Sequence, residues 1–223
     1  MKPLVLGNLS YGMYAIGVKD GSRPNACIAN TVMQISKATP SDAALVAVAL
    51  SKENYSCQCV EQEGIFSISV LSQDTPATVI GALGFVSGRG VDKLGNIRHK
   101  VLIEGVPVIK ENTCCWFLCK VISGMDVGQE MVFAAEIIAG SDSAIGTPMT
   151  YDFYRSEMHG LSPVGSPTYV PPESTFDKSS GESFVCSVCG YVYSDPNFSF
   201  EELRDNWVCP VCKMPKKAFV RRN

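Results

Sequence analysis

The sequence predicts a mainly β protein: an antiparallel barrel followed by a small C-terminal module that binds a metal ion. Three observations support this prediction. Segments with β-branched or alternating apolar residues recur through the first 140 residues, a stretch rich in proline, glycine and serine follows, and cysteines spaced as metal ligands come last. With 46% hydrophobic residues in 223, the chain is able to bury a core, which excludes a disordered or fibrous protein.

The predicted strands are bounded by glycine, proline or aspartate. They cover Tyr14–Val18, Ala44–Leu50, Phe66–Leu71, Trp116–Ile122 and Met131–Ala139. Two short helices are expected between them. The first runs over Tyr55–Glu63 and stops at Gly64, and the second has Thr75 as its N-cap, Pro76 in its first position and its end near Leu83. Many strands with few helices indicate a closed or nearly closed antiparallel barrel.

A linker separates the barrel from the end of the chain. Residues 160–183 lack apolar periodicity and are dominated by proline, glycine and serine. We therefore expect a barrel domain at 1–159, a linker at 160–183 and a module at 184–223. A domain of about 40 residues needs a metal ion or disulfides to be stable.

Four of the ten cysteines have the spacing of a metal site. Cys186, Cys189, Cys209 and Cys212 form two C-x2-C pairs with nineteen residues between them. Four thiolates form a tetrahedral site that suits zinc or iron, and the spacing alone leaves both open. The other six lack such spacing, and we interpret them as packing residues: Cys27, Cys57, Cys59, Cys114, Cys115 and Cys119.

The residues around these four cysteines favour iron. The motifs are Cys189-Gly190-Tyr191 and Trp207-Val208-Cys209-Pro210, followed by Phe219, and with them the module resembles rubredoxin. The resemblance implies one iron, held by the four thiolates and alternating between Fe3+ and Fe2+, under an aromatic core of Tyr191, Trp207 and Phe219. The segment between the cysteine pairs is shorter than usual, and Lys213 replaces the glycine that usually provides a positive φ.

A second resemblance covers residues 1–157. It rests on Tyr11–Tyr14, Asn25–Val32, Val46–Ser56, Phe66–Leu71, Phe85–Arg89 and Gly146–Tyr151. In order and spacing, these segments resemble the flavin reductase-like, FMN-binding split-barrel family. The resemblance implies an antiparallel split barrel and a homodimer with FMN at the subunit interface.

Candidate FMN-binding residues follow from these segments. Ser51, Lys52 and Tyr55 lie where a strand enters a helix, so free backbone N–H groups and an ammonium are expected to meet the phosphate. The remaining candidates are Ala29, Asn30, Thr31 and Val32 along the flavin ring, and Ser87, Gly88, Arg89 and Lys93 on a second polar loop. No catalytic residue is assigned. Glu130 stands where the family often has histidine, so nicotinamide handling is expected to differ.

Together the two resemblances imply an NAD(P)H-oxidising electron-transfer protein, with FMN passing electrons to the iron. The fusion resembles the high-molecular-weight rubredoxins of anaerobes, which implies that a flavodiiron protein reducing nitric oxide or dioxygen is the acceptor. The alternatives are a flavin reductase that releases reduced flavin, a zinc-ribbon binding protein, and electron flow in the reverse order. The net charge of −3 and the lack of a long apolar segment predict a cytoplasmic protein with no nucleic-acid or membrane partner.

Overall fold

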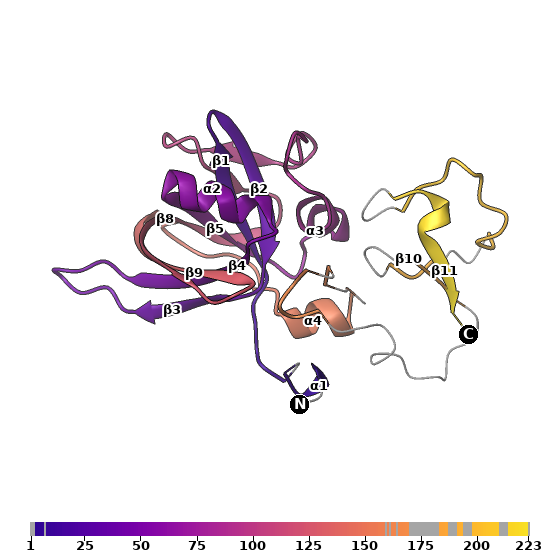
Figure 1. Ribbon diagram of the computed structural model, residues 1–223, viewed down its shortest axis with the longest axis horizontal. Coiled ribbons are helices and arrows are strands. Elements are labelled where there is room, and N and C mark those ends of the chain that lie inside the picture. The colour runs from indigo at the N-terminus through magenta and orange to yellow at the C-terminus, as the bar shows by residue number, and fades with distance from the viewer. Residues whose placement is uncertain are drawn as a thin grey trace.

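The structure is a computed structural model of the chain. It describes residues 3–6, 8–158, 160, 162–163, 165–169, 183–186, 191–193, 198–209 and 214–222. These residues form a strongly curved sheet with helices at its sides and, near the C-terminus, a small separate hairpin (Figure 1).

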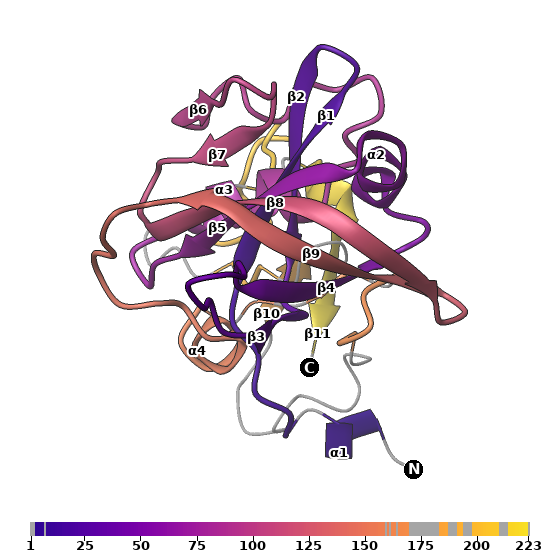
Figure 2. The same ribbon diagram turned by 90° about the vertical axis from the view of Figure 1, so that its left-hand side faces the viewer.

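Seven antiparallel strands form the main sheet, in the order β2-β1-β5-β8-β9-β4-β3. Their bounds are β1 (Tyr14–Asp20), β2 (Arg23–Ala29), β3 (Val32–Ser36), β4 (Leu45–Ser51), β5 (Ile65–Leu71), β8 (Thr113–Asp126) and β9 (Glu130–Gly140). The edge strands β2 and β3 are consecutive, and the described strand pairing does not join them (Figure 2). The sheet is thus a barrel open at one seam. The predicted mainly β split barrel is confirmed, and each predicted strand is present.

The barrel encloses an apolar core that alternate strand residues provide. Across the β5–β8 ladder, Phe66 lies opposite Cys119 and Ile68 opposite Phe117. Helix α2 (Tyr55–Glu63) adds further side chains from one side. The packing interpretation of the first cysteines is confirmed for those in this core, namely Cys27, Cys57, Cys59 and Cys119, each at most 3% exposed.

The first predicted helix is confirmed in full. The side chain of Asn54 caps α2, and Gly64 ends it in the left-handed conformation at φ 66°. The second helix, α3 (Ala77–Gly84), is present, but Thr75 as its cap is wrong. Pro76 is the N-cap residue, because the Thr75 hydroxyl instead donates to the carbonyl of Asn112 at 2.7 Å and so ties two loops together.

Several short elements were not predicted. They are α1 (Pro3–Leu6), β2, β3, the hairpin of β6 (His99–Val101) and β7 (Pro107–Ile109), and α4 (Tyr151–Ser156). Helices α3 and α4 close one end of the barrel, where Leu83, Tyr151 and Tyr154 share a second apolar cluster with Met13. None of the described helices is long and apolar enough to cross a membrane.

The C-terminal part has its own small core. Strand β10 (Ser183–Cys186) pairs antiparallel with β11 (Phe219–Arg222), and the short 3-10 helix η2 (Lys216–Ala218) precedes β11. In Figure 1 this hairpin lies beyond α3, on the side away from the sheet.

Candidate functional site

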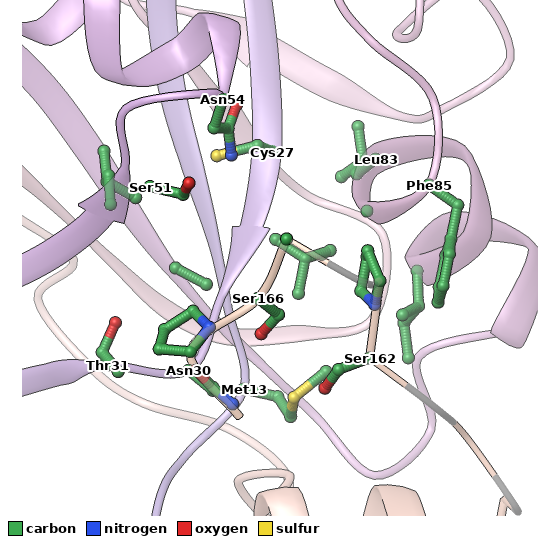
Figure 3. Close-up of a pocket in the computed structure, with 18 of the residues that line it drawn as sticks. Met13, Cys27, Asn30, Thr31, Ser51, Asn54, Leu83, Phe85, Ser162 and Ser166 are labelled. Atoms are coloured by element: carbon green, nitrogen blue, oxygen red, sulfur yellow. The ribbon is translucent and has the colours of Figure 1, made fainter. Parts of the chain in front are cut away.

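A pocket of about 270 Å³ lies beside the seam of the barrel. Its wall combines the β2–β3 connection, the end of β4 with the start of α2, and the last turn of α3 (Figure 3). Ile28 and Leu83 contribute apolar surface, whereas Thr31 and Ser51 contribute hydroxyl groups. An apolar cavity with a few polar groups at its border is typical of a cofactor site.

The structure brings most of the predicted FMN-binding residues to this wall. Those that line it are Ala29, Asn30, Thr31, Ser51, Tyr55, Ser87 and Lys93. Val32, Lys52, Gly88 and Arg89 do not line it. Figure 3 shows Thr31 and Ser51 on one side of the pocket and Phe85, which was not predicted, on the other.

Side chains at the β4–α2 junction already accept hydrogen bonds from two of its backbone N–H groups. Asn54 Oδ1 accepts a hydrogen bond from the backbone N–H of Ser56 at 3.0 Å, and Ser51 Oγ accepts one from that of Glu53 at 3.4 Å. Ser51, Asn54 and Tyr55 line the pocket, so the N-terminal end of α2 faces it. The partial positive charge of a helix N-terminus attracts phosphate.

Lys52 turns away from the pocket. Its ammonium pairs with Asp126 Oδ1 at 2.5 Å, and this hydrogen bond holds the pKa of Asp126 below its usual value. Glu130, which lies opposite Ser51 in the β4–β9 ladder, is half-buried. Burial, followed by the nearby charge of Glu53, raises the pKa of Glu130. Lys52 is thus paired with Asp126 rather than lining the pocket, and Glu130, whose pKa is raised, lies opposite Ser51 in the sheet.

Lys93 is a buried structural cation at the end of α3. Its ammonium donates to the carbonyls of Leu83 at 2.9 Å and Val86 at 3.0 Å, and only 8% of the residue is exposed. Burial lowers the pKa of Lys93. These bonds satisfy carbonyl groups that the last helical turn leaves unpaired, so Lys93 fixes the segment that follows α3.

Arg89 and Gly88, in the loop after α3, pack against neighbouring side chains and do not line the pocket. Arg89 donates to Gln58 Oε1 at 2.7 Å, and its guanidinium lies 4.5 Å from the ring centre of Tyr55. Gly88 packs so closely on Asn25 that a Cβ atom would collide with the amide side chain. Arg89 therefore reaches the pocket only through the Tyr55 ring, whereas Val32 pairs with Val48 in the sheet.

One part of the wall was not predicted. The described residues 162–163 and 165–169, the post-α4 segment, fall in the expected linker, yet Ser162 and Ser166 line the pocket (Figure 3). The hydroxyl groups of Tyr151 and Ser162 are 2.5 Å apart, and Asn30 Nδ2 donates to Thr168 Oγ1 at 2.8 Å. The amino-acid composition predicts a linker here because the segment has no apolar periodicity. Its contacts come instead from isolated hydroxyl groups, which form no pattern in the sequence.

The C-terminal cysteines that the structure describes are buried. Cys186 is 1% exposed and Cys209 is fully buried. The backbone N–H of Cys186 donates to the carbonyl of Tyr191, and that of Cys209 donates to Met214. The other two predicted ligands, Cys189 and Cys212, and the neighbouring Lys213 lie outside the described residues.

Aromatic rings surround these two thiols. Cys186 and Cys209 form a cluster with Phe200 and Phe219, and the predicted aromatic residues pack against it. The ring centres of Trp207 and Phe219 are 5.3 Å apart. Rings at such spacings exclude water from the sulfur atoms.

The described residues fit the two groups that the resemblances imply, namely FMN and a thiolate-bound metal ion. The pocket offers apolar sides to a ring system and a helix N-terminus with hydroxyl groups to a phosphate. The C-terminal cluster offers the buried sulfur atoms of Cys186 and Cys209 among aromatic rings, which suits a thiolate-bound metal.

Comparisons with known proteins also divide the chain into a barrel and a C-terminal cysteine-containing part. Residues 6–162 match the family model described as flavin reductase like domain, and residues 183–219 match rubredoxin. The chain is similar to a high molecular weight rubredoxin of Moorella thermoacetica, with 32% identity over 230 residues that cover 98% of this chain and 99% of that protein.

Two further similarities concern the barrel. A ferric-chelate reductase (NAD(P)H) of Archaeoglobus fulgidus is 30% identical over 161 residues, covering 72% of this chain and 93% of that protein. The crystal structure of a flavoredoxin from Methanosarcina acetivorans matches with a TM-score of 0.54 and 23% identity, covering 62% of this chain and 74% of that chain. At this identity the flavoredoxin shows a likeness of fold alone.

Proposed function

Because the chain belongs to the flavin reductase-like family and carries a C-terminal rubredoxin domain, we propose that it oxidises NAD(P)H and passes the electrons through FMN to the rubredoxin iron. The observation that carries the proposal is the presence of the pocket and the buried cysteine cluster in one chain. FMN supplies the conversion that this requires, since it accepts a hydride and gives up electrons singly, whereas the iron accepts one.

The wall residues have distinct proposed roles. Ser51 and the N-terminal turn of α2 bind the phosphate, while the backbone of Asn30 and Thr31 meets the polar edge of the ring. Ala29, Tyr55, Ser87 and Lys93 complete the proposed contacts. FMN, the smaller of the two flavin cofactors, is proposed for this pocket, whose volume of about 270 Å³ in one chain lies just below the roughly 300–1,000 Å³ of ligand pockets.

We propose that two copies of the chain form the functional unit. Edge strand β3 exposes Met33 and Ile35 at 62% and 46%, and β8 exposes Ile122 and Met125 at 55% and 58%. Large exposed apolar side chains on an edge strand and on β8 favour an interface. β3 follows the pocket residue Thr31 directly, so a second copy at this surface would extend the small pocket.

A single charge tests this interface. Met33→Asp is expected to convert the dimer to a monomer in light scattering after size-exclusion chromatography, because it buries an unpaired carboxylate. Ile103→Asp is the control, since Ile103 is 99% exposed in the β6–β7 turn. A wild-type monomer, or a dimer that Met33→Asp leaves intact, would refute this interface.

The proposed acceptor is a flavodiiron protein that reduces nitric oxide or dioxygen, on the basis of the resemblance of the two-domain fusion to high-molecular-weight rubredoxins. Mixing NADH, this protein and a purified flavodiiron protein is expected to consume dioxygen or nitric oxide. The same mixture with the zinc-substituted rubredoxin domain is the control, because zinc does not change its oxidation state. Equal consumption with zinc would exclude this route.

We also place the protein in the cytoplasm. The barrel cysteines, Cys27, Cys57, Cys59, Cys114, Cys115 and Cys119, carry free thiols, and several lie together in the barrel core. A reducing compartment keeps such thiols unoxidised. Fractionation of the source cells, with detection by an antibody, checks this assignment.

Metal and flavin analysis with anaerobic stopped-flow spectroscopy tests the central proposal. We expect one iron per chain, and NADH is expected to bleach the flavin band first and the iron band afterwards. Flavin-depleted protein should not show iron bleaching until FMN is restored. Zinc without flavin, or iron bleaching without flavin, would overturn the proposal, and recovery with FAD alone would replace FMN by FAD.

A matched pair of variants tests the phosphate site. Ser51→Ala is expected to weaken FMN binding about fivefold, since one hydrogen bond contributes about 1 kcal/mol. Ser41→Ala should leave the affinity unchanged, because Ser41 is exposed on the turn before β4, outside the pocket wall. Equal affinities for both variants would remove Ser51 from the phosphate site.

A second candidate function is that of a flavin reductase, in which the barrel releases reduced flavin that acts in solution. The similarity to a ferric-chelate reductase (NAD(P)H) supports an NAD(P)H-linked reductase in either case. Retention of the yellow colour during desalting distinguishes the two. Complete loss of flavin at micromolar protein concentrations would favour the released-flavin function.

A further inference from the structure

Phe85 occupies a fixed position between the two parts of the chain. It follows the last residue of α3, and its backbone N–H donates to the carbonyl of Gly81 at 3.1 Å. The ammonium of Lys93 bonds to carbonyl groups on both sides of it, at Leu83 and Val86. These hydrogen bonds hold the backbone on both sides of Phe85, whose side chain is half-buried.

The Phe85 side chain contacts two sites at once. It lines the pocket proposed for FMN, as Figure 3 shows at the end of α3. It also packs against the buried cluster of Cys186, Phe200, Cys209 and Phe219. Among the described hydrophobic residues packed against that cluster, Phe85 is the one that comes from the barrel.

We propose that Phe85 is the docking residue that holds the rubredoxin domain against the FMN pocket and thereby positions it for electron transfer. This inference rests on the proposed function. Each NAD(P)H gives two electrons and one proton to the flavin, and each electron passed on reduces one Fe3+ to Fe2+. The docked iron accepts one electron, and an external acceptor must oxidise it before the second is transferred.

The contact is suited to reversible docking. Interfaces between domains of one chain bury about 600–1,500 Å² and resemble transient ones, and a single aromatic residue buries only about 150–250 Å². A short tether supplies an effective concentration in the millimolar range, so a weak contact is enough to keep the domain docked part of the time. Undocking then exposes the rubredoxin surface to the external acceptor.

Phe85→Ala tests the proposal in the full-length protein saturated with FMN. In anaerobic stopped-flow experiments with NADH, we expect iron bleaching to slow at least tenfold more than flavin bleaching does. Phe85→Leu should lie between Phe85→Ala and the wild type, because leucine keeps part of the apolar contact. Phe198→Ala is the matched control, since Phe198 is 60% exposed and does not belong to the cluster.

A structural measurement complements the kinetics. In small-angle X-ray scattering of the oxidised protein, Phe85→Ala should increase the radius of gyration, whereas Phe198→Ala should not. The visible spectrum of the iron verifies that the domain remains folded in each variant. Wild-type iron bleaching and scattering in Phe85→Ala would overturn the docking role.

The two proposals fail in different ways. If NADH does not reduce the iron of the wild type, the proposed function is wrong, and scattering alone then reports whether Phe85 docks the domain. If the wild type reduces its iron and Phe85→Ala does so at the same rate relative to the flavin, only the docking role is wrong.

Discussion

The buried cysteines of the barrel and those of the rubredoxin domain lie in different surroundings. Cys57 and Cys119 sit in a core of mostly aliphatic side chains that several strands and α2 provide, and burial raises the pKa of each thiol to about 12. Cys186 and Cys209 sit in a small cluster of aromatic rings close to chain turns. The first pair packs as neutral thiols, whereas the second is arranged for a metal ion.

The difference follows from the size of each part. The barrel has enough strands to bury a continuous apolar core, so a cysteine there acts as a small apolar residue. The rubredoxin domain is too short for such a core, so a metal ion must supply much of its folding free energy.

The largest expected effect is on the metal domain. Cys209→Ala should abolish iron binding and make residues 183–222 sensitive to trypsin, because structural metals contribute about 10 kcal/mol or more to folding in small domains. Cys57→Ala is the matched control and should retain its iron. Metal analysis and limited proteolysis measure these two effects. An iron content per chain in Cys209→Ala equal to that of the wild type would contradict a metal-binding role for Cys209.

A core truncation in the barrel should have the next largest effect. Ile68 is 1% exposed, and Ile68→Ala is expected to lower the free energy of unfolding of the barrel by about 2–5 kcal/mol. Ile103→Ala, at a residue 99% exposed, should change it little. In urea titrations the iron absorption of Ile68→Ala should persist after the barrel unfolds, and simultaneous loss of both signals would show that the two parts are not independent.

Alkaline pH should destabilise the barrel through its thiols. The pKa of Cys119 is about 12 in the fold and about 8.5 in an unfolded chain, so the unfolded state loses its proton first as the pH rises. The contribution of this thiol to stability is complete below pH 8.5 and decreases as the pH rises toward 12.

Comparison between variants isolates this contribution. The lowered pKa of Lys93 acts in the opposite sense, because its unfolded state binds the extra proton, so the wild-type profile contains both effects. Cys119→Ala should therefore show a smaller loss of unfolding free energy between pH 8.5 and pH 10.5 than the wild type. A profile parallel to that of the wild type would argue against the raised pKa.

The smallest expected effect concerns the post-α4 segment. Thr168→Val removes the acceptor of the Asn30 hydrogen bond at 2.8 Å, and FMN affinity should fall a few-fold, since such a bond contributes about 1 kcal/mol. Thr39→Val, in an exposed turn, is the control. Fluorescence titration with FMN measures both, and an unchanged Thr168→Val affinity would show that the segment does not position Asn30.

Local chemistry explains which elements the sequence predicted well. Helix α2 matches its prediction because Asn54 and Gly64, which determine its ends, form hydrogen bonds with backbone groups of the helix itself. Strands β1, β4, β5, β8 and β9 match because their apolar residues alternate or run continuously. The cap of α3 was wrong because the hydroxyl of Thr75 finds a partner 37 residues away, which no local pattern reports.

The same distinction applies to the site. The sequence by itself determined the C-x2-C pairs, the strand-to-helix junction at Ser51 and the residues at the seam, because each lies within one short segment. Only the tertiary structure decided that Lys52 pairs with Asp126, that the post-α4 segment reaches Asn30, and that Phe85 touches both the pocket and the cysteine cluster. Such contacts join residues far apart in the chain, and their geometry depends on how the whole barrel closes and on where its connections return.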